Sequence, residues 1–247
     1  MLKGLWKLTW VETKVFLREP MGVFGTIGIP VVLFIVLGNL WGSEGGSSLP
    51  FEEAPFNVPI LAALMITISA VLSLIAIISI YREGGILKRL RATPLTPVTI
   101  LSAHVLVKLG FTIITLILLV IAGRQFFPGA LTVNLFSFSI ALLLSSVSIL
   151  SLGFVVASIV PTARFAQPIG AGVVYPMLSI SGLFFPIDIL PSALQLLAYS
   201  FPTTHAYLLM EGIWDGAGWG AHWSNVLALV VIFAVCTSIS SKIFRWE

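Results

Sequence analysis

One short stretch of this 247-residue sequence concentrates charged residues that could bind another molecule. The stretch, YREGGILKRLRATPLTP at residues 81–97, holds four of the thirteen Lys and Arg residues and lies between two long apolar runs. Its basic residues are Arg82, Lys88, Arg89 and Arg91. Basic residues beside an apolar run either fix the stretch on the cytosolic side of a membrane or dock a partner there. Both interpretations place the stretch in the cytosol.

No residue pattern in the chain indicates catalysis, metal binding or nucleotide binding. The HExxH, GxSxG and GxxxxGK[ST] motifs are absent, and the centres of the apolar runs contain no Asp, Glu, Lys, Arg or His. His205 and His222 could bind a ligand or a metal ion, but neither has a neighbouring ligand at metal spacing. We therefore expect no catalytic residue, metal site or cofactor on this chain. Energy for uphill transport would have to come from another polypeptide.

The composition excludes a large soluble domain. Hydrophobic residues make up 58% of the chain and charged residues only 9%, whereas soluble domains carry about 25% charged residues. The mean hydropathy is +1.08. We therefore expect an all-α integral membrane protein that forms a single domain over residues 1–247. The one cysteine, Cys236, excludes a disulfide within the chain.

Six apolar segments are candidates to cross a bilayer, which requires about 20 residues in a helix. They lie at residues 23–40, 58–80, 105–122, 134–160, 168–185 and 223–241. Thr96 and Pro97 have the chemistry of a helix start. The third helix should therefore run from Pro97 to Ala122, with His104 and Lys108 at or below the membrane interface. Residues 161–167 should form a tight turn.

The distribution of charge orients the predicted spans. Twelve of the thirteen basic residues lie in the N-terminal segment, residues 81–108, the 161–167 turn and the C-terminus. The opposite side carries only Arg124, together with six acidic residues. The positive-inside rule therefore predicts that both termini face the cytosol, as in a multi-pass protein of the inner cell membrane. Because the net charge of +3 follows the membrane sides, it suits lipid head groups and not nucleic acid.

Residues 1–20 predict an amphipathic helix that lies along the membrane surface. Its basic residues recur at helical same-face spacing, and Trp6 and Trp10 suit the boundary between water and lipid. The basic residues are Lys3, Lys7, Lys14 and Arg18. A signal peptide is the alternative, but no small-residue cleavage site follows the apolar run.

Within the basic stretch, residues 83–92 predict a short helix between the second and third spans. Ile86, Leu87 and Leu90 fall on one face of this helix. Pro94 ends it, because the residue before a proline avoids the helical conformation.

Two segments of the sequence resemble type-2 permeases, the membrane-spanning subunits of ATP-binding-cassette (ABC) exporters. One is REGGILKRLRATPLTP after the second predicted span, and the other is SGLFFPIDILPSALQLLAYSFPTTHAYLLMEGI at residues 181–213. Together with the six-span layout, the resemblance covers effectively the whole chain. It implies a working unit of two permeases, either two copies or two homologues, and two ATPase subunits that bind ATP and Mg.

The resemblance also implies roles for particular segments. The first cytosolic loop would form a coupling helix that docks on the ATPase, residues 1–20 would be an interfacial elbow helix, and residues 186–222 would be a re-entrant pair of short helices. The docking residues carried over by position are Glu83, Gly84, Leu87, Lys88, Arg89, Leu90, Arg91, Pro94 and Leu95. Family members commonly have a basic residue and Gly-Thr after the Glu, whereas Gly84, Gly85 and Ile86 follow here. The coupling helix would therefore start later or be looser than usual.

The resemblance places the second and fifth spans beside the dimer centre, where they would line a translocation path. The candidates are Thr67, Ser69, Ser73, Tyr175, Ser179, Ser181 and Phe184. Small and hydroxyl residues in spans more often form helix–helix contacts, and we take this interpretation for the Ser-rich fourth span. A path without fixed charge suits a hydrophobic or amphipathic substrate such as a drug-like molecule, a lipid or a lipid-linked glycan.

The sequence thus predicts the transport subunit of an exporter, without enzymatic activity of its own. Two other classes of protein remain as alternatives. A passive channel or membrane scaffold would need no ATPase partner. A membrane-embedded enzyme is disfavoured by the lack of acid–base and metal-binding groups.

Overall fold

The computed structural model describes residues 2–18, 20–42, 67–86, 97–126, 134–160, 162–183 and 186–243. Every secondary-structure element in these ranges is a helix, which confirms the all-α class. The helices are α1 (Leu2–Leu17), α2 (Pro20–Val23), η1 (Phe24–Gly28), α3 (Ile29–Gly42), η2 (Ile68–Leu72), α5 (Ser73–Glu83), α7 (Pro97–Phe126), α8 (Leu135–Ile159), α9 (Ala163–Ser179), η3 (Ile187–Ile189), α10 (Ser192–Ala198), α11 (Pro202–Trp214), α12 (Gly218–Ala221) and α13 (Trp223–Ile243).

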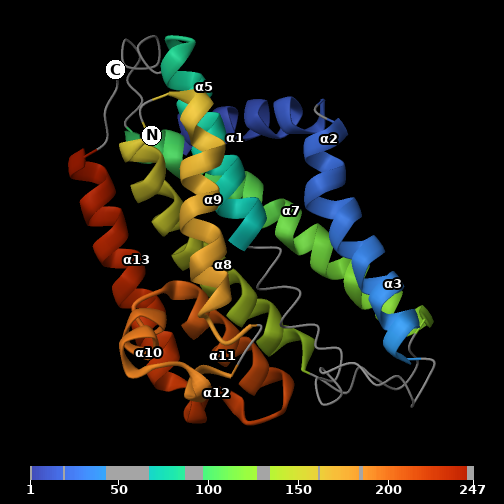
Figure 1. Cartoon of the computed structure of the whole chain (residues 1–247). Helices are drawn as coiled ribbons and strands as arrows, with labels where there is room; N and C mark the ends of the chain where they lie inside the picture. Colours follow the sequence, from blue (N-terminus) through green and yellow to red (C-terminus); the bar gives the residue numbers. More distant parts are fainter. Residues whose placement is uncertain are drawn as a thin grey trace.

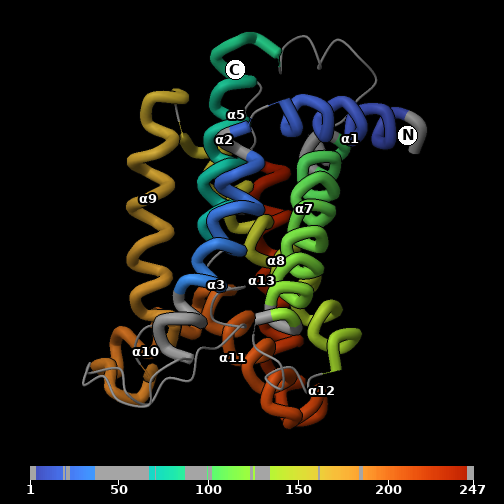
Figure 2. Tube along the Cα trace, turned by 90° about the vertical axis from the view of Figure 1, so that its right-hand side faces the viewer, coloured from blue at the N-terminus to red at the C-terminus, as the bar shows by residue number. Residues whose placement is uncertain are grey.

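The long helices run side by side and reverse direction from one to the next (Figure 1). Helix α1 lies across one end of this bundle, where the C-terminal ends of α5, α8 and α13 also lie. Helices α10, α11 and α12 lie at the opposite end, and the view turned by 90° shows the same arrangement (Figure 2). We call the end with α1 the α1 end. It is the end that the charge distribution predicts to be cytosolic.

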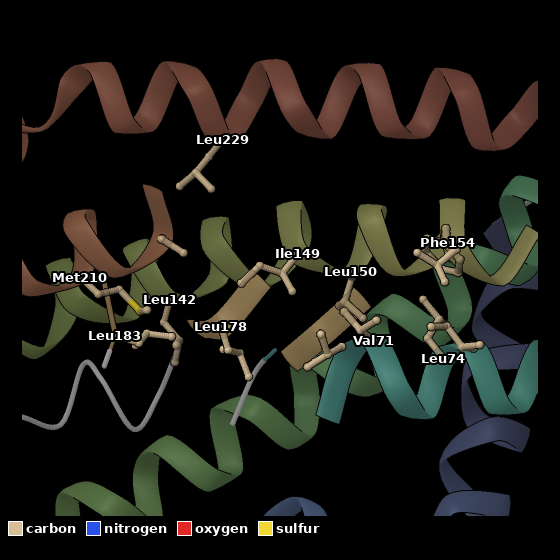
Figure 3. Close-up of a cluster of buried hydrophobic side chains, with 14 of the residues drawn as sticks. Val71, Leu74, Leu142, Ile149, Leu150, Phe154, Leu178, Leu183, Met210 and Leu229 are labelled. Carbon is tan, nitrogen blue, oxygen red and sulfur yellow. The ribbon is translucent and has the colours of Figure 1, made fainter. Parts of the chain in front are cut away.

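Helix α8 lies at the centre of the bundle and packs against α5, α7, α11 and α13. In Figure 3, its residues Ile149, Leu150 and Phe154 lie between Leu229 of α13 and Leu74 of α5. Apolar burial drives little association inside a membrane, so close packing of small residues carries more weight there. The buried small residues of α8 include Ala141, Ser145, Ser148, Gly153 and Ala157.

Serine residues in the middle of α8 take part in this packing, in agreement with the prediction for the Ser-rich span. Ser145, Ser146, Ser148 and Ser151 are buried. Ser148 Oγ donates a hydrogen bond to the Leu229 carbonyl of α13 at 3.0 Å. Such interhelical hydrogen bonds hold neighbouring membrane helices in register.

Both ends of α8 follow from local sequence. The Asn134 side chain accepts a hydrogen bond from Ser137 N at 3.3 Å and so caps the first turn. Val160 at the other end has φ −60° and ψ 123°, the extended conformation that a following proline favours. The predicted span at 134–160 therefore agrees with α8 to within one residue at each end.

Three of the described helices are long and apolar enough to cross a membrane: Ser102–Ala122 within α7, Leu135–Ile159 and Trp223–Ile243. The first predicted span contains a shorter apolar helix, Phe24–Val36. Much of the second, at 58–66, lies outside the described residues. Helix α9, in the region of the fifth, has 17 residues and a length of about 26 Å at 1.5 Å per residue. The six-span layout stays a prediction.

Several predicted boundaries are wrong, and one is the end of the fifth predicted span at residue 185, since α9 ends at Ser179. Helix α9 begins at Ala163 and contains Pro168 and Pro176, so residues 163–167 do not form the predicted tight turn. A proline inside a helix removes one hydrogen bond, but neighbouring helices make this tolerable in membrane proteins. Helix α7 begins at Pro97 as predicted but continues beyond Ala122 to Phe126.

Gly170 of α9 provides a test of this packing, because a Cβ there would lie 2.9 Å from Leu72 Cδ2 and 3.2 Å from Ile75 Cδ1. We expect Gly170→Val to force α9 away from α5 and to destabilise the protein by about 1–3 kcal/mol, as overpacking does. Gly172→Val is the matched control, since no atom lies within 4 Å of a Cβ at Gly172. Thermal unfolding in detergent measures both variants, and equal midpoints would contradict the described contact.

Candidate functional site

The predicted docking stretch leaves the bundle at the C-terminal end of α5. Three successive residues there, Tyr81, Arg82 and Glu83, each bond to a different part of the protein. These bonds join α5 to α1, to the end of α8 and to the start of α9. We call this group of contacts the α5 joint.

Arg82 binds the C-terminal end of α8. Its Nη1 donates a hydrogen bond to the Val160 carbonyl, and its Nη2 donates one to the Ala157 carbonyl at 3.2 Å. The Arg82 side chain is buried. The last carbonyls of a helix have no partner within the helix and carry the negative end of its dipole, so a guanidinium there satisfies both needs.

Glu83 binds the N-terminal end of α9. Its Oε1 accepts a hydrogen bond from Ala163 N at 2.8 Å. The residue at the N-cap position, Thr162, makes no side-chain capping bond of its own. Glu83 therefore caps α9 from another helix, and its negative charge suits the positive end of the α9 dipole.

Tyr81 binds α1 through a buried carboxyl group. Its hydroxyl lies 2.9 Å from both oxygens of Glu12 and donates a hydrogen bond to the carboxyl group. His104 of α7 also faces this group, with Nδ1 3.6 Å from Glu12 Oε2. Glu12 is only 5% exposed, so α1 is attached to α5 and α7 by a polar contact in an otherwise apolar surface.

The surroundings of Glu12 change its acidity. Burial raises the pKa of the Glu12 carboxyl above its usual value, and the hydrogen bond from Tyr81 opposes this effect.

Aromatic contacts also join α1 to α7. Lys108 lies one turn beyond His104 on α7, with its Nζ 4.5 Å from the centre of the Phe16 ring. A second aromatic contact joins Phe16 to Phe111, with ring centres 4.4 Å apart.

The α5 joint corrects the predicted start of the coupling helix. Glu83 is the last residue of α5, and the chain then turns at Gly84 and Gly85. Gly85 has φ +66°, a left-handed conformation that glycine adopts most easily. A new helix therefore cannot begin at Glu83 and begins no earlier than Ile86. The other predicted docking residues, Leu87, Lys88, Arg89, Leu90, Arg91, Pro94 and Leu95, lie outside the described residues.

The predicted path residues that the structure describes lie on or directly beside three elements, η2, α5 and α9. Ser69 and Ser73 are on η2 and α5, where Ser69 Oγ lies 3.5 Å from Thr26 Oγ1 and the Ser73 hydroxyl bonds to the Ser69 carbonyl. Tyr175 and Ser179 are on the exposed surface of α9, with Tyr175 59% exposed. Thr67 and Ser181 are fully buried, and Phe184 lies outside the described residues. Their role in a path stays a prediction.

The end opposite α1 contains the two histidines considered for ligand binding. His205 Nδ1 lies 3.0 Å from Asn225 Oδ1, and His205 Nε2 lies 2.9 Å from the Tyr199 carbonyl. Asn225 Nδ2 lies 3.3 Å from His222 Nδ1. In the part of the chain that the structure describes, no group of three or more His, Cys, Asp or Glu side chains could hold a metal ion.

A cavity of about 420 Å³ lies near this end and contains none of the predicted path residues. It is lined by Asn134, Ser137, Ile213, Trp214, Asp215, Gly216, Gly218 and Trp219.

Comparison with known proteins identifies the family. The family model described as "ABC-2 type transporter" matches residues 3–213, which include the α5 joint and most of the bundle. This chain belongs to the ABC-2 type transporter family. No curated protein matched the sequence.

Membership of the ABC-2 family gives the chain a general role. It is a multi-pass membrane protein and a membrane subunit of an ABC transporter, and it belongs to a family whose members do not catalyse a reaction themselves. ABC-2 permeases generally work with an ATP-binding subunit.

The sequence predictions missed Glu12 of this ABC-2 protein, although a signal for it is present. Leu5, Thr9, Glu12 and Phe16 recur at helical same-face spacing. Glu12 therefore lies on the face of α1 opposite the basic residues. A carboxyl group on an inward face requires a polar partner. The sequence alone does not identify Tyr81 and His104 as these partners.

The raised pKa of Glu12 predicts how stability depends on pH. The contribution of protonated Glu12 to stability is complete below the ordinary carboxyl pKa of 4.5. Above that pH the unfolded state releases the proton while the folded state still holds it. The contribution is therefore lost as pH rises through the higher pKa of the folded protein. We expect Glu12→Gln, which stays neutral and can still accept a hydrogen bond from Tyr81, to lack this contribution, so that its unfolding midpoint rises relative to that of the wild type as pH increases through this range. Thermal unfolding across this pH range measures the effect.

Asp188→Asn is the control for Glu12→Gln, because Asp188 is an exposed carboxylate in η3, which contacts α10. This variant should keep the wild-type pH dependence. An unchanged pH dependence in Glu12→Gln would contradict the assignment of the effect to the α5 joint.

Proposed function

We propose that this chain forms the translocation path of an ABC exporter for a hydrophobic or amphipathic substrate. The observation that carries the proposal is the match of the ABC-2 family model to residues 3–213. The substrate would be a drug-like molecule, a lipid or a lipid-linked glycan. The uncharged centres of the predicted spans support this class, because an intramembrane charge usually marks an ion or proton pathway.

The energy for transport comes from ATP and Mg bound by a separate ATPase subunit. That subunit docks on residues 83–95, and two permease chains, either copies or homologues, form the working unit with two ATPases. The position of the stretch supports this assignment. It leaves the bundle directly from the α5 joint. A force on the stretch would therefore act on α1, α8 and α9, because Tyr81, Arg82 and Glu83 bond to these helices.

The charge distribution supports an inner-membrane location with both termini in the cytosol. In this orientation the α1 end faces the ATPase, and the basic residues of α1 face lipid head groups. Lys7, Lys14 and Arg18 are exposed, as are Trp6 and Trp10. This combination of exposed basic and indole side chains supports a helix that lies in the membrane interface.

Charge reversal in the docking stretch tests the proposal. We expect the combined substitutions Lys88→Glu, Arg89→Glu and Arg91→Glu to lower the amount of substrate exported per ATP hydrolysed by at least about ten-fold. Losing paired charges at an interface produces an effect of this order. The chain should still insert into the membrane. Export of a fluorescent amphipathic dye, ATP hydrolysis and co-purification of the ATPase measure the three quantities.

Lys242→Glu is the control for the reversed charge, since Lys242 is an exposed basic residue in the last turn of α13, also at the α1 end. This variant should export normally. Undiminished co-purification of the ATPase together with normal export in the triple variant would refute docking at residues 83–95.

A further inference from the structure

Two neighbouring residues at the end of α5 hold both sides of the break between α8 and α9. Arg82 donates to the carbonyls of Ala157 and Val160, where α8 ends. Glu83 accepts from Ala163 N, where α9 begins. We call these contacts the Arg82–Glu83 bridge.

The charges of the bridge match the two helix ends in order. The C-terminal end of α8 is negative and receives the guanidinium, whereas the N-terminal end of α9 is positive and receives the carboxylate. Hydrogen bonds to charged groups are stronger than those between neutral groups. Arg82 is only 9% exposed, so water competes little for its bonds. The bridge therefore adds buried bonds from Arg82 and one exposed bond to Glu83 to the packing of α5 against α8 and α9.

The Arg82–Glu83 bridge lies at the start of the proposed docking stretch, residues 83–95, and includes its first residue. Only Gly84, Gly85 and Ile86 separate Glu83 from residues 87–96. A force applied to that stretch therefore reaches the bridge before it reaches the rest of α5. Because α8 contacts α11 and α13, a shift of its end is passed to helices that do not adjoin the docking stretch in the sequence.

We infer that Arg82 and Glu83 are positioning residues that transmit movement of the docking stretch to α8 and α9. This inference rests on the proposed function. It adds a second route for the ATPase-driven movement, in addition to the direct covalent route through α5 and α7. Loss of the bridge leaves the ATPase bound but reduces the amount of substrate exported for each ATP hydrolysed.

Ala163→Pro tests the bridge with little change to the fold. Proline has no N–H and so removes the hydrogen bond to Glu83, but it is well tolerated at the first position of a helix. Thr162 has φ −143° and ψ 159°, an extended conformation compatible with a following proline. Ser192→Pro is the matched control, since Ser192 is the first residue of α10 at the other end of the bundle.

Arg82→Lys tests the other half of the bridge. Lysine keeps the positive charge at the end of α8 but lacks the fork that reaches two carbonyl groups at once. Arg82→Gln removes the charge as well. Lys242→Gln controls for the loss of one basic residue at the α1 end.

The experiment uses the full chain reconstituted in lipid vesicles with the ATPase that co-purifies with it. Four quantities are measured for each variant: bound ATPase, ATP hydrolysis, export of a fluorescent amphipathic dye and the thermal unfolding midpoint. We expect Ala163→Pro and Arg82→Lys to keep wild-type amounts of bound ATPase and to lose at least about five-fold in dye exported per ATP, a typical size for coupling between distant sites. Arg82→Gln should lose more, and both controls should match the wild type.

A purely structural role predicts a different result. If the unfolding midpoint falls but dye exported per ATP stays within about two-fold of wild type, the inference is overturned. A loss of export that only follows a loss of bound ATPase also overturns it. If the wild-type chain binds no ATPase, or moves dye equally well without ATP, the proposed function fails and the inference fails with it.

Discussion

The break between α8 and α9 imposes a constraint on which the α1 end of the protein depends. A helix that stops leaves carbonyl groups without partners, and a helix that starts leaves N–H groups without partners. Near the apolar part of a membrane, each such group costs several kcal/mol if nothing bonds to it. From α5, Arg82 supplies a partner for two of these carbonyl groups, and Glu83 supplies one for the first N–H group of α9. The two charged residues thus satisfy part of what the two helix ends require.

The bonds of Arg82 and Glu83 to the ends of α8 and α9 also fix the position of α5 relative to these helices. Directly after the residues that hold α5 against α8 and α9, the chain turns at Gly84 and Gly85. The residue before Arg82, Tyr81, faces α1 and bonds to Glu12. The stretch proposed to receive the ATPase thus starts from a point fixed in three directions. Such a fixed origin is what a mechanical connection requires.

The sequence predicted well those features that depend on long apolar runs and on local capping. The ends of α8 and the start of α7 agree with the Asn134 cap and the Thr96–Pro97 start signal. It predicted less well the features set by contacts between distant residues. The start of α9 was placed too late, because its first turn is capped by Glu83, 80 positions earlier in the chain. Nothing in the local sequence indicates that Pro168 lies inside a helix.

The candidate site was predicted only in part, for the same reason. The residue types of the docking stretch drew attention to Arg82 and Glu83, and the structure finds both bonded within the chain. Glu12 and His104 belong to the same region but lie far from it in sequence, so spacing could not connect them to Tyr81. The six spans and the translocation path depend on membrane depth and on a second permease chain, and the interactions within one chain do not determine them.

The central claim is that this ABC-2 subunit moves its substrate only when an ATPase drives it, and flux in reconstituted vesicles tests this most directly. A fluorescent amphipathic dye is followed in vesicles that contain the chain alone, the chain with its co-purified ATPase, and the same complex with ATP and Mg. We expect export only in the last case. Equal flux through the chain alone would refute transport driven by an ATPase and would identify a passive channel.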